Sequence, residues 1–196
     1  MSEAPAPGSP AQALAARYRE RGAVESAYGQ DTVDVPRESW VEALTVARDE
    51  LGYGYFDFLT AVDQLDADPE PGFDVVVHLW SLADHAHLLV RTRVPATDAV
   101  LASATSVFAG ASWHERETFE MFGVDFAGHP HLVPLLLPDG FEGHPLRKDF
   151  VLAARAAKAW PGAKEPGESD GDAHSSPSRR KTRPPGVPDP EAWGPR

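Results

Sequence analysis

Residues 73–94, FDVVVHLWSLADHAHLLVRTRV, contain two apolar runs separated by a short polar turn. Apolar and polar residues largely alternate over residues 73–79 and again over residues 88–94. Such alternation indicates a β-strand with one buried face, because successive side chains of a strand point to opposite sides. The short connection at residues 83–85 joins two such strands as an antiparallel pair. The stretch therefore predicts a β-hairpin.

Further strands and a helix are expected on the N-terminal side of this hairpin. Residues 55–62 show the alternation of a third strand, and residues 24–35 contain short apolar pieces typical of one or two more. Residues 37–51 carry apolar side chains spaced four, three and four residues apart, which predicts an amphipathic helix. Gly52 is the expected stop of this helix, because glycine readily adopts the left-handed conformation found after a helix C-terminus.

A second helix is expected after the hairpin, over residues 97–108. Thr97 is a candidate N-cap, the apolar residues that follow recur at helical spacing, and Gly110 ends the run. Because the strands precede the late helices without alternating with them, the sequence predicts an α+β fold. We expect a two-layer domain in which helices pack on a small, mostly antiparallel sheet.

Composition divides the chain into three parts. Residues 1–22 begin with small residues and proline and are expected to be disordered or weakly helical. Residues 23–152 contain the apolar patterns and are expected to form the α+β domain, an ordinary size for one domain. Residues 153–196 are dominated by proline, glycine, serine and charge. We expect an extended or disordered C-terminal tail there, after a helical turn at residues 153–159.

Charge, cysteine content and hydropathy exclude several classes of function. The 196-residue chain has a net charge of −12 and a pI near 5.0, so nucleic acid is not an expected partner. It contains no cysteine, which excludes disulfides, thiolate nucleophiles and cysteine-bound iron–sulfur clusters in this chain. No apolar run approaches the roughly 18 residues that cross a bilayer, and no secretory signal is recognised. The protein is therefore expected in the cytoplasm.

The densest set of motifs lies in residues 111–150, ASWHERETFEMFGVDFAGHPHLVPLLLPDGFEGHPLRKDF. Ser112 and Glu115 have the spacing of a capping box, in which each residue binds a backbone N–H of the other. This spacing predicts a helix over residues 113–122, with Gly123 as its left-handed stop. A helix of this length is too short to be stable alone, so it must depend on tertiary contacts.

The charged residues of this helix allow two interpretations. Arg116 and Glu120 are spaced as an i,i+4 ion pair, and Glu117 lies beside them. Several glutamates in one short helix could serve acid–base chemistry, which requires a carboxylate with a shifted pKa in a closed pocket. The alternative, which charge runs on helices favour, is a solvated or partner-facing charged face.

Histidines of the same stretch are candidates for a metal site. His129, His131 and His144 could together bind a metal ion, since neutral imidazole is a common ligand. Their spacing matches no closed zinc pattern, so loop histidines bonded to backbone are the favoured interpretation. His85 and His87 form a separate H-x-H pattern, for which an exposed hairpin edge is expected.

The stretch ends in a group of charges between apolar residues. Arg147, Lys148 and Asp149 lie between Leu146 and Phe150. This composition suits an intersubunit contact, where arginine and aromatic residues are enriched. No nucleotide-binding loop, hydrolase elbow or metalloprotease motif occurs in the chain.

Residues 111–150 resemble the signature of the C-type subunit of NADH-quinone oxidoreductase, which is respiratory complex I. Residue type and spacing agree across the stretch, and a weaker resemblance extends back to residue 37. The matching residues are Glu115-Arg116-Glu117, Met121-Phe122-Gly123, Phe126, His129-Pro130, Leu132 and Gly143-His144-Pro145-Leu146-Arg147-Lys148-Asp149-Phe150.

The chain departs from the family pattern at two places. The family usually has aspartate where this chain has Glu120, which is a mild change. It usually has two arginines where this chain has Val133 and Pro134. Pro134 donates no backbone hydrogen bond and restricts its neighbour, so the local contacts of these two residues should differ.

The resemblance implies a non-catalytic structural subunit in the peripheral arm of a proton-translocating NADH:quinone oxidoreductase. It implies partners of the D type, which contains the quinone site, and of the cluster-bearing B and I types. Flavin, iron–sulfur clusters and quinone are then expected on partner subunits and no cofactor on this chain. The implied location is the cytoplasmic side of the cell membrane, reached through the complex. Residues expected at partner interfaces are Glu115, Arg116, Glu117, Glu120, His129, Arg147, Lys148 and Asp149.

Two alternatives stay open at this point. The equivalent subunit of a membrane-bound hydrogenase complex also resembles this stretch. A free-standing hydrolase would instead use Glu117, or the three histidines at positions 129, 131 and 144 as metal ligands.

Overall fold

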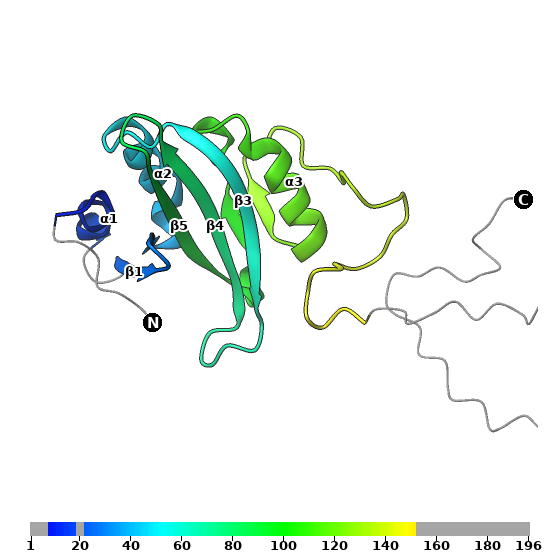
Figure 1. Cartoon of the computed structure of the whole chain (residues 1–196). Coiled ribbons are helices and arrows are strands. Elements are labelled where there is room, and N and C mark those ends of the chain that lie inside the picture. The colour runs from blue at the N-terminus through cyan, green and yellow to red at the C-terminus, as the bar shows by residue number, and fades with distance from the viewer. Residues whose placement is uncertain (1–7, 19–21, 152–196) are drawn as a thin grey trace, which may run out of the picture.

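The computed structural model describes residues 8–18 and 22–151, which fold around a five-stranded sheet (Figure 1). The strand order is β1-β2-β5-β4-β3, and all neighbours are antiparallel except β2 and β5. The predicted α+β fold with a mostly antiparallel sheet is confirmed. The strands are β1 (Ala23–Ala27), β2 (Gln30–Asp34), β3 (Tyr55–Gln64), β4 (Gly72–Ser81) and β5 (Ala86–Pro95).

The predicted hairpin is strands β4 and β5, which pair along their whole length. Val75, Val77 and Leu79 of β4 are fully buried, as the alternation predicts. The turn contains the exposed His85, whose φ of +51° is unusual for a residue with a side chain. His87 is half-buried, because its ring stacks on the neighbouring strand. The exposed edge predicted for these two histidines is therefore right only for the first.

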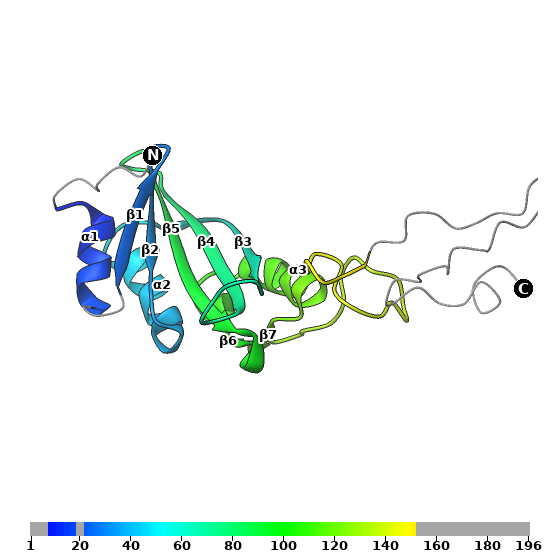
Figure 2. The same ribbon diagram turned by 90° about the horizontal axis from the view of Figure 1, so that it is seen from below.

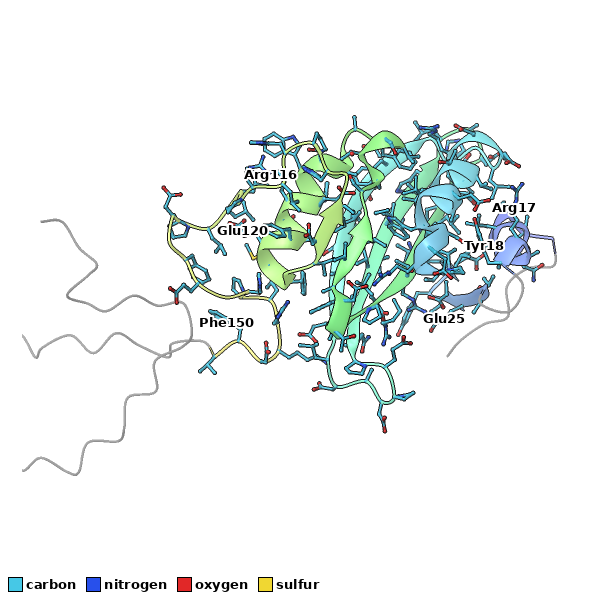
Figure 3. The ribbon with its side chains drawn as sticks, turned by 180° about the vertical axis from the view of Figure 1, so that it is seen from behind. Arg17, Tyr18, Glu25, Arg116, Glu120 and Phe150 are labelled. Carbon is cyan, nitrogen blue, oxygen red and sulfur yellow. The ribbon has the colours of Figure 1, made fainter. Side chains whose placement is uncertain are left out.

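Helices supply the second layer. α2 (Trp40–Asp49) follows the 3₁₀ turn η2 (Arg37–Ser39) and confirms the predicted helix over residues 37–51, with Gly52 behind it at a φ of +80°. α1 (Pro10–Ala15) continues into η1 (Ala16–Tyr18) and packs against β1, β2 and α2. Seen from behind, α2 and α3 (Ala111–Phe122) lie in front of the sheet (Figure 3). In the described part of the chain, the face turned to the viewer in Figure 1 carries no helix.

The helix predicted over residues 97–108 is wrong. This segment forms two short 3₁₀ turns, η3 (Ala96–Asp98) and η4 (Ala104–Ser106), on either side of strand β6 (Val100–Ala102). β6 pairs in parallel with β7 (Asp125–Ala127). This distant partner supplies the hydrogen bonds that a helix would have made internally, so tertiary pairing overrides local spacing.

Several predictions fall on residues outside the described ranges. They are the disorder of the first residues, the helical turn at residues 153–159 and the state of the tail to residue 196. The division of the chain into three parts stays a prediction. Within residues 8–18 and 22–151, no helix has the length and apolarity to cross a membrane.

The two tryptophans of the helices provide a test of the fold. Trp40 is completely buried in the core, whereas the Trp113 side chain on α3 is 65% exposed. We expect Trp40→Ala to lower the free energy of unfolding by about 3–5 kcal/mol, because it removes a large buried ring and leaves a cavity. The matched control, Trp113→Ala, should change it by less than about 0.5 kcal/mol. Urea unfolding followed by circular dichroism measures both, and equal losses would contradict the fold.

Candidate functional site

A long irregular segment follows β7 and passes over α3 on the side away from the sheet. We call residues 128–151 the strap; it lies beyond α3 in both views (Figures 1 and 2). Every residue of the strap is at least partly exposed, although the His129 side chain is itself buried and residues 132–137 are almost entirely apolar. No residue of the strap is buried in the core, although Leu132 packs against it, so polar contacts are needed to hold the rest of the strap.

Two charged residues of α3 fix the middle of the strap. The Arg116 guanidinium donates from Nε to the carbonyl oxygen of Val133 at 2.9 Å and from Nη2 to that of Pro134 at 2.8 Å. The Glu120 carboxylate accepts from the next three backbone N–H groups, those of residues 135–137, at 2.7–3.1 Å. Figure 3 shows both side chains on the helix flank that faces the strap. The i,i+4 ion pair predicted between them is wrong, because each binds backbone instead.

We call the hydrogen bonds from Arg116 and Glu120 to residues 133–137 the clamp. The clamp explains how the chain accommodates Pro134. Arg116 uses only carbonyl oxygens at residues 133 and 134, and a proline carbonyl accepts as well as any other. The missing N–H of proline is needed at neither position, since Glu120 binds only the amides that follow. The expected difference from the family in local contacts stays a prediction.

The C-terminus of α3 is capped by the second His-Pro step of the strap. Gly123, at a φ of +72°, donates its N–H to the Phe119 carbonyl and ends the helix as predicted. The next three carbonyls of the helix, those of residues 120–122, would otherwise lack partners. They accept in turn from His144 Nδ1 at 2.9 Å, Leu146 N at 3.2 Å and Arg147 Nε at 2.5 Å.

Arg147 has a further role besides capping. Its charge lies at the helix C-terminus, where a cation interacts favourably with the helix dipole. Its Cζ lies 5.1 Å from the ring centroid of the buried Phe73 on β4, a cation–π contact to the core. A Cβ at Gly123 would lie within 2.5 Å of the His144 and Arg147 side chains, so this position requires glycine for space as well as conformation.

The end of the strap is anchored to the sheet. The buried Asp63 of β3 accepts from the backbone N–H of Lys148 at 2.7 Å, and the Lys148 ammonium group lies 3.0 Å from the exposed Asp66 carboxylate. Both partners of the second contact are largely exposed, so it contributes little to stability. Asp63 was not among the predicted site residues. The strand pattern could have indicated it, because Asp63 lies two residues after the buried Ala61 and so places a carboxylate on the buried face of β3.

Glu115 is the most buried charge of α3, and it does not form the predicted capping box. Its Oε2 accepts from the Ser103 hydroxyl and its Oε1 from the Ala104 N–H, both at 2.6 Å. Glu115 thereby binds the start of η4, while the N-terminus of its own helix has no side-chain cap. Burial raises the pKa of Glu115 to about 6, although both hydrogen bonds act to lower it.

His129 fits beside Glu115 but has other partners. Its Nδ1 accepts from the His131 backbone N–H at 2.9 Å, so the ring proton belongs on Nε2, which lies 3.1 Å from the Ser112 carbonyl oxygen. Nε2 is 4.0 Å from the Glu115 carboxylate, too far for a hydrogen bond. His144 lies at the other end of α3. Among the residues the structure describes, no group of three or more potential ligands could hold a metal ion.

The remaining predicted site residues face solvent. Glu117 and Asp149 are exposed, and neither carboxylate bonds to another described residue. A general base needs a pocket with a positioned proton donor or acceptor, and Glu117 has neither. Six of the eight predicted residues thus hold the strap and its surroundings, while these two face outward. Chemically, the arrangement fixes an apolar segment on the surface of the molecule.

The chain matches known proteins over the same region. The model of the family described as "Respiratory-chain NADH dehydrogenase, 30 Kd subunit" matches residues 33–156, more than half of the chain. The C-type subunit of NADH-quinone oxidoreductase from Citrifermentans bemidjiense is 43% identical over 124 residues, which are 63% of this chain and 76% of the relative. A C-type subunit from Rhizobium meliloti is 43% identical over 145 residues, 71% of each chain. The chain belongs to this family, whose members are subunits of the respiratory NADH-quinone oxidoreductase, complex I.

Solved structures agree with this assignment. The trypsin-resistant fragment of Nqo5 is 30% identical, with a TM-score of 0.55 over 62% of this chain and 95% of the fragment. A chain of the membrane-bound sulfane sulfur reductase, an archaeal respiratory membrane complex, has a TM-score of 0.61 at 23% identity. The match covers 73% of this chain and 84% of the reductase chain, and it shows that the two share a fold. The resemblance found in the sequence is confirmed.

The clamp predicts that Glu120→Gln will loosen the strap. A glutamine has one acceptor oxygen for three backbone donors, and its NH₂ group would face an N–H, so we expect a local loss of about 2–3 kcal/mol. Hydrogen exchange at the amides of residues 135–137 measures this as faster opening. Glu117→Gln, one turn away on the same helix, is the matched control and should leave exchange unchanged. Equal protection in both variants would contradict the clamp.

Burial of Glu115 predicts a specific pH dependence of stability. Its pKa is about 6 in the folded protein against an ordinary 4.5, so the folded state binds more protons between these values. The free energy of unfolding should therefore fall by up to about 2 kcal/mol as pH rises through this window. Glu115→Gln keeps an acceptor for Ala104 and cannot ionise, so the variant should lack this fall. Urea unfolding from pH 4 to 8 tests it; parallel curves for the two proteins would refute it.

Proposed function

We propose that the chain is a non-catalytic structural subunit in the peripheral arm of a proton-translocating NADH:quinone oxidoreductase. The observation that supports this most is that charged side chains of α3 and the strap bind backbone groups of the chain itself. Arg116, Glu120 and Arg147 bind backbone groups of α3 or of the strap. Side chains used in this way position a surface and are not free to bind or convert a substrate.

The proposed partners are the D-type subunit that contains the quinone site and the cluster-bearing B- and I-type subunits. Flavin, iron–sulfur clusters and quinone then belong to those partners. On this proposal the complex brings the chain to the cytoplasmic side of the cell membrane. The direct interface role expected for eight residues stays a prediction, and the contacts favour it most for Glu117, Lys148 and Asp149, whose side chains are exposed.

The proposal separates assembly from turnover. In membranes of cells that carry Glu120→Gln, we expect less assembled NADH:quinone oxidoreductase, because a loosened strap presents its surface poorly. Turnover per assembled complex should stay at the wild-type value. Native gel electrophoresis quantifies the assembled complex, and NADH:quinone activity divided by that amount gives turnover. Glu42→Gln, which removes an exposed charge on α2, is the control for the loss of one helix charge and should leave assembly unchanged.

Two results would overturn the proposal. Normal assembly with reduced turnover per complex would indicate a direct chemical role for the chain. Copurification of a hydrogenase large subunit in place of flavin-binding NADH-input subunits would assign the chain to the hydrogenase-type assembly. Mass spectrometry of the partners of the intact chain distinguishes the two assemblies.

A further inference from the structure

The described part of the chain is more acidic than the chain as a whole. Residues 8–18 and 22–151 contain 22 aspartates and glutamates but only 8 lysines and arginines. Every one of these cations makes an intramolecular contact with a carboxylate or a carbonyl oxygen. The eight are Arg17, Arg37, Arg48, Arg91, Arg93, Arg116, Arg147 and Lys148. A partner of this surface therefore meets mostly negative charge.

Exposed apolar side chains follow α3 and the strap. Trp113 projects from the first turns of α3, Leu136 from the clamped middle of the strap and Leu146 from the cap of the helix, and each is more than half exposed. Trp113 shares a helix flank with Arg116 and Glu120, which bind residues 133–137, so Trp113 and Leu136 lie on the same side of α3. Large apolar groups exposed together on one side mark an interaction surface. The clamp and the cap hold their backbone in place, so little conformational entropy remains to be lost on binding.

Exposed carboxylates lie among these apolar groups. Glu117 is one helical turn from Trp113, Asp139 and Glu142 follow Leu136 in the strap, and Asp149 follows Leu146. None of these four carboxylates bonds to another residue of the described part of the chain. We call the three apolar and four acidic residues the docking patch.

We propose that the docking patch binds a partner subunit whose surface has an apolar recess rimmed by lysine and arginine. This inference rests on the proposed function and specifies the chemistry of the partner. The tryptophan and the leucines would fill the recess, and the four carboxylates would meet the basic rim, as at interfaces with complementary potentials. An anionic membrane would be repelled by the patch, and a second copy of this chain would place acid against acid.

The experiment uses the full chain with an affinity tag in cells that make the complex. After mild detergent extraction, the amount of copurified D-type subunit per tagged chain is measured. We expect Trp113→Ala with Leu136→Ala to lower this amount at least tenfold. The matched control is Leu82→Ala in the β4–β5 turn, where the leucine is 67% exposed against 59% for Leu136. This control should copurify like the wild type.

Charge reversal tests the sign of the partner surface. Glu117→Lys should reduce copurification several-fold at low salt, and the deficit should shrink at high salt because screening weakens repulsion between the new lysine and the basic rim. Glu42→Lys, which reverses an exposed charge on α2, is the control and should have no effect. Circular dichroism spectra and melting curves establish that the variants fold.

Each outcome separates the two proposals. Wild-type chain that copurifies no NADH:quinone oxidoreductase subunit would overturn the proposed function itself. Wild-type copurification with patch variants equal to their controls would overturn the docking patch alone. Stronger copurification of Glu117→Lys would show that the partner surface is acidic and would overturn its proposed chemistry.

Discussion

A charge inside a protein is stable only when hydrogen bonds replace the water it has lost, and the buried carboxylates of α3 obey this constraint. Glu115 finds its donors at the start of η4, before the helix in sequence, and Glu120 finds three donors in the strap, after it. The two carboxylates therefore tie the segments on both sides of α3 to the helix.

A similar constraint governs the helix C-terminus. Unpaired carbonyls at the end of a helix need donors, and the strap supplies them from His144, Leu146 and Arg147. The strap receives support from Arg116 and Glu120 in return. Helix and strap are thus mutually dependent: a helix of 12 residues is marginal alone, and an irregular segment that buries so little of its surface has no order of its own.

Local pattern was sufficient for elements that satisfy their own hydrogen bonds or pair with a sequence neighbour. The β4–β5 hairpin, helix α2 and the Gly123 stop are of this kind. It failed for β6, whose partner β7 lies more than 20 residues away in the chain, and sequence spacing does not record such a pairing. The candidate site shows the same limit. Helical spacing predicts that Glu115 pairs with Ser112 and that Arg116 pairs with Glu120. The actual partners are backbone atoms and a hydroxyl brought close by folding. Residue type can indicate that a buried charge needs donors, whereas only the fold determines which donors it finds.

Recognition of backbone rather than side chains has a consequence for how this surface can vary. Arg116 and Glu120 bind carbonyl and amide groups that every strap sequence offers, with the single requirement that residues 135–137 are not proline. Side chains of the strap can therefore change without loss of these hydrogen bonds, which the uncharged Val133 and the proline at position 134 both support through their carbonyl groups. Residues 132–137 carry no charge, and the exposed acids Asp139 and Glu142 follow them in the strap. Arg116 and Glu120 thus set the path of the strap backbone, whereas the strap side chains set the chemistry of its surface. The side chains can therefore change to suit a partner while the backbone path is kept.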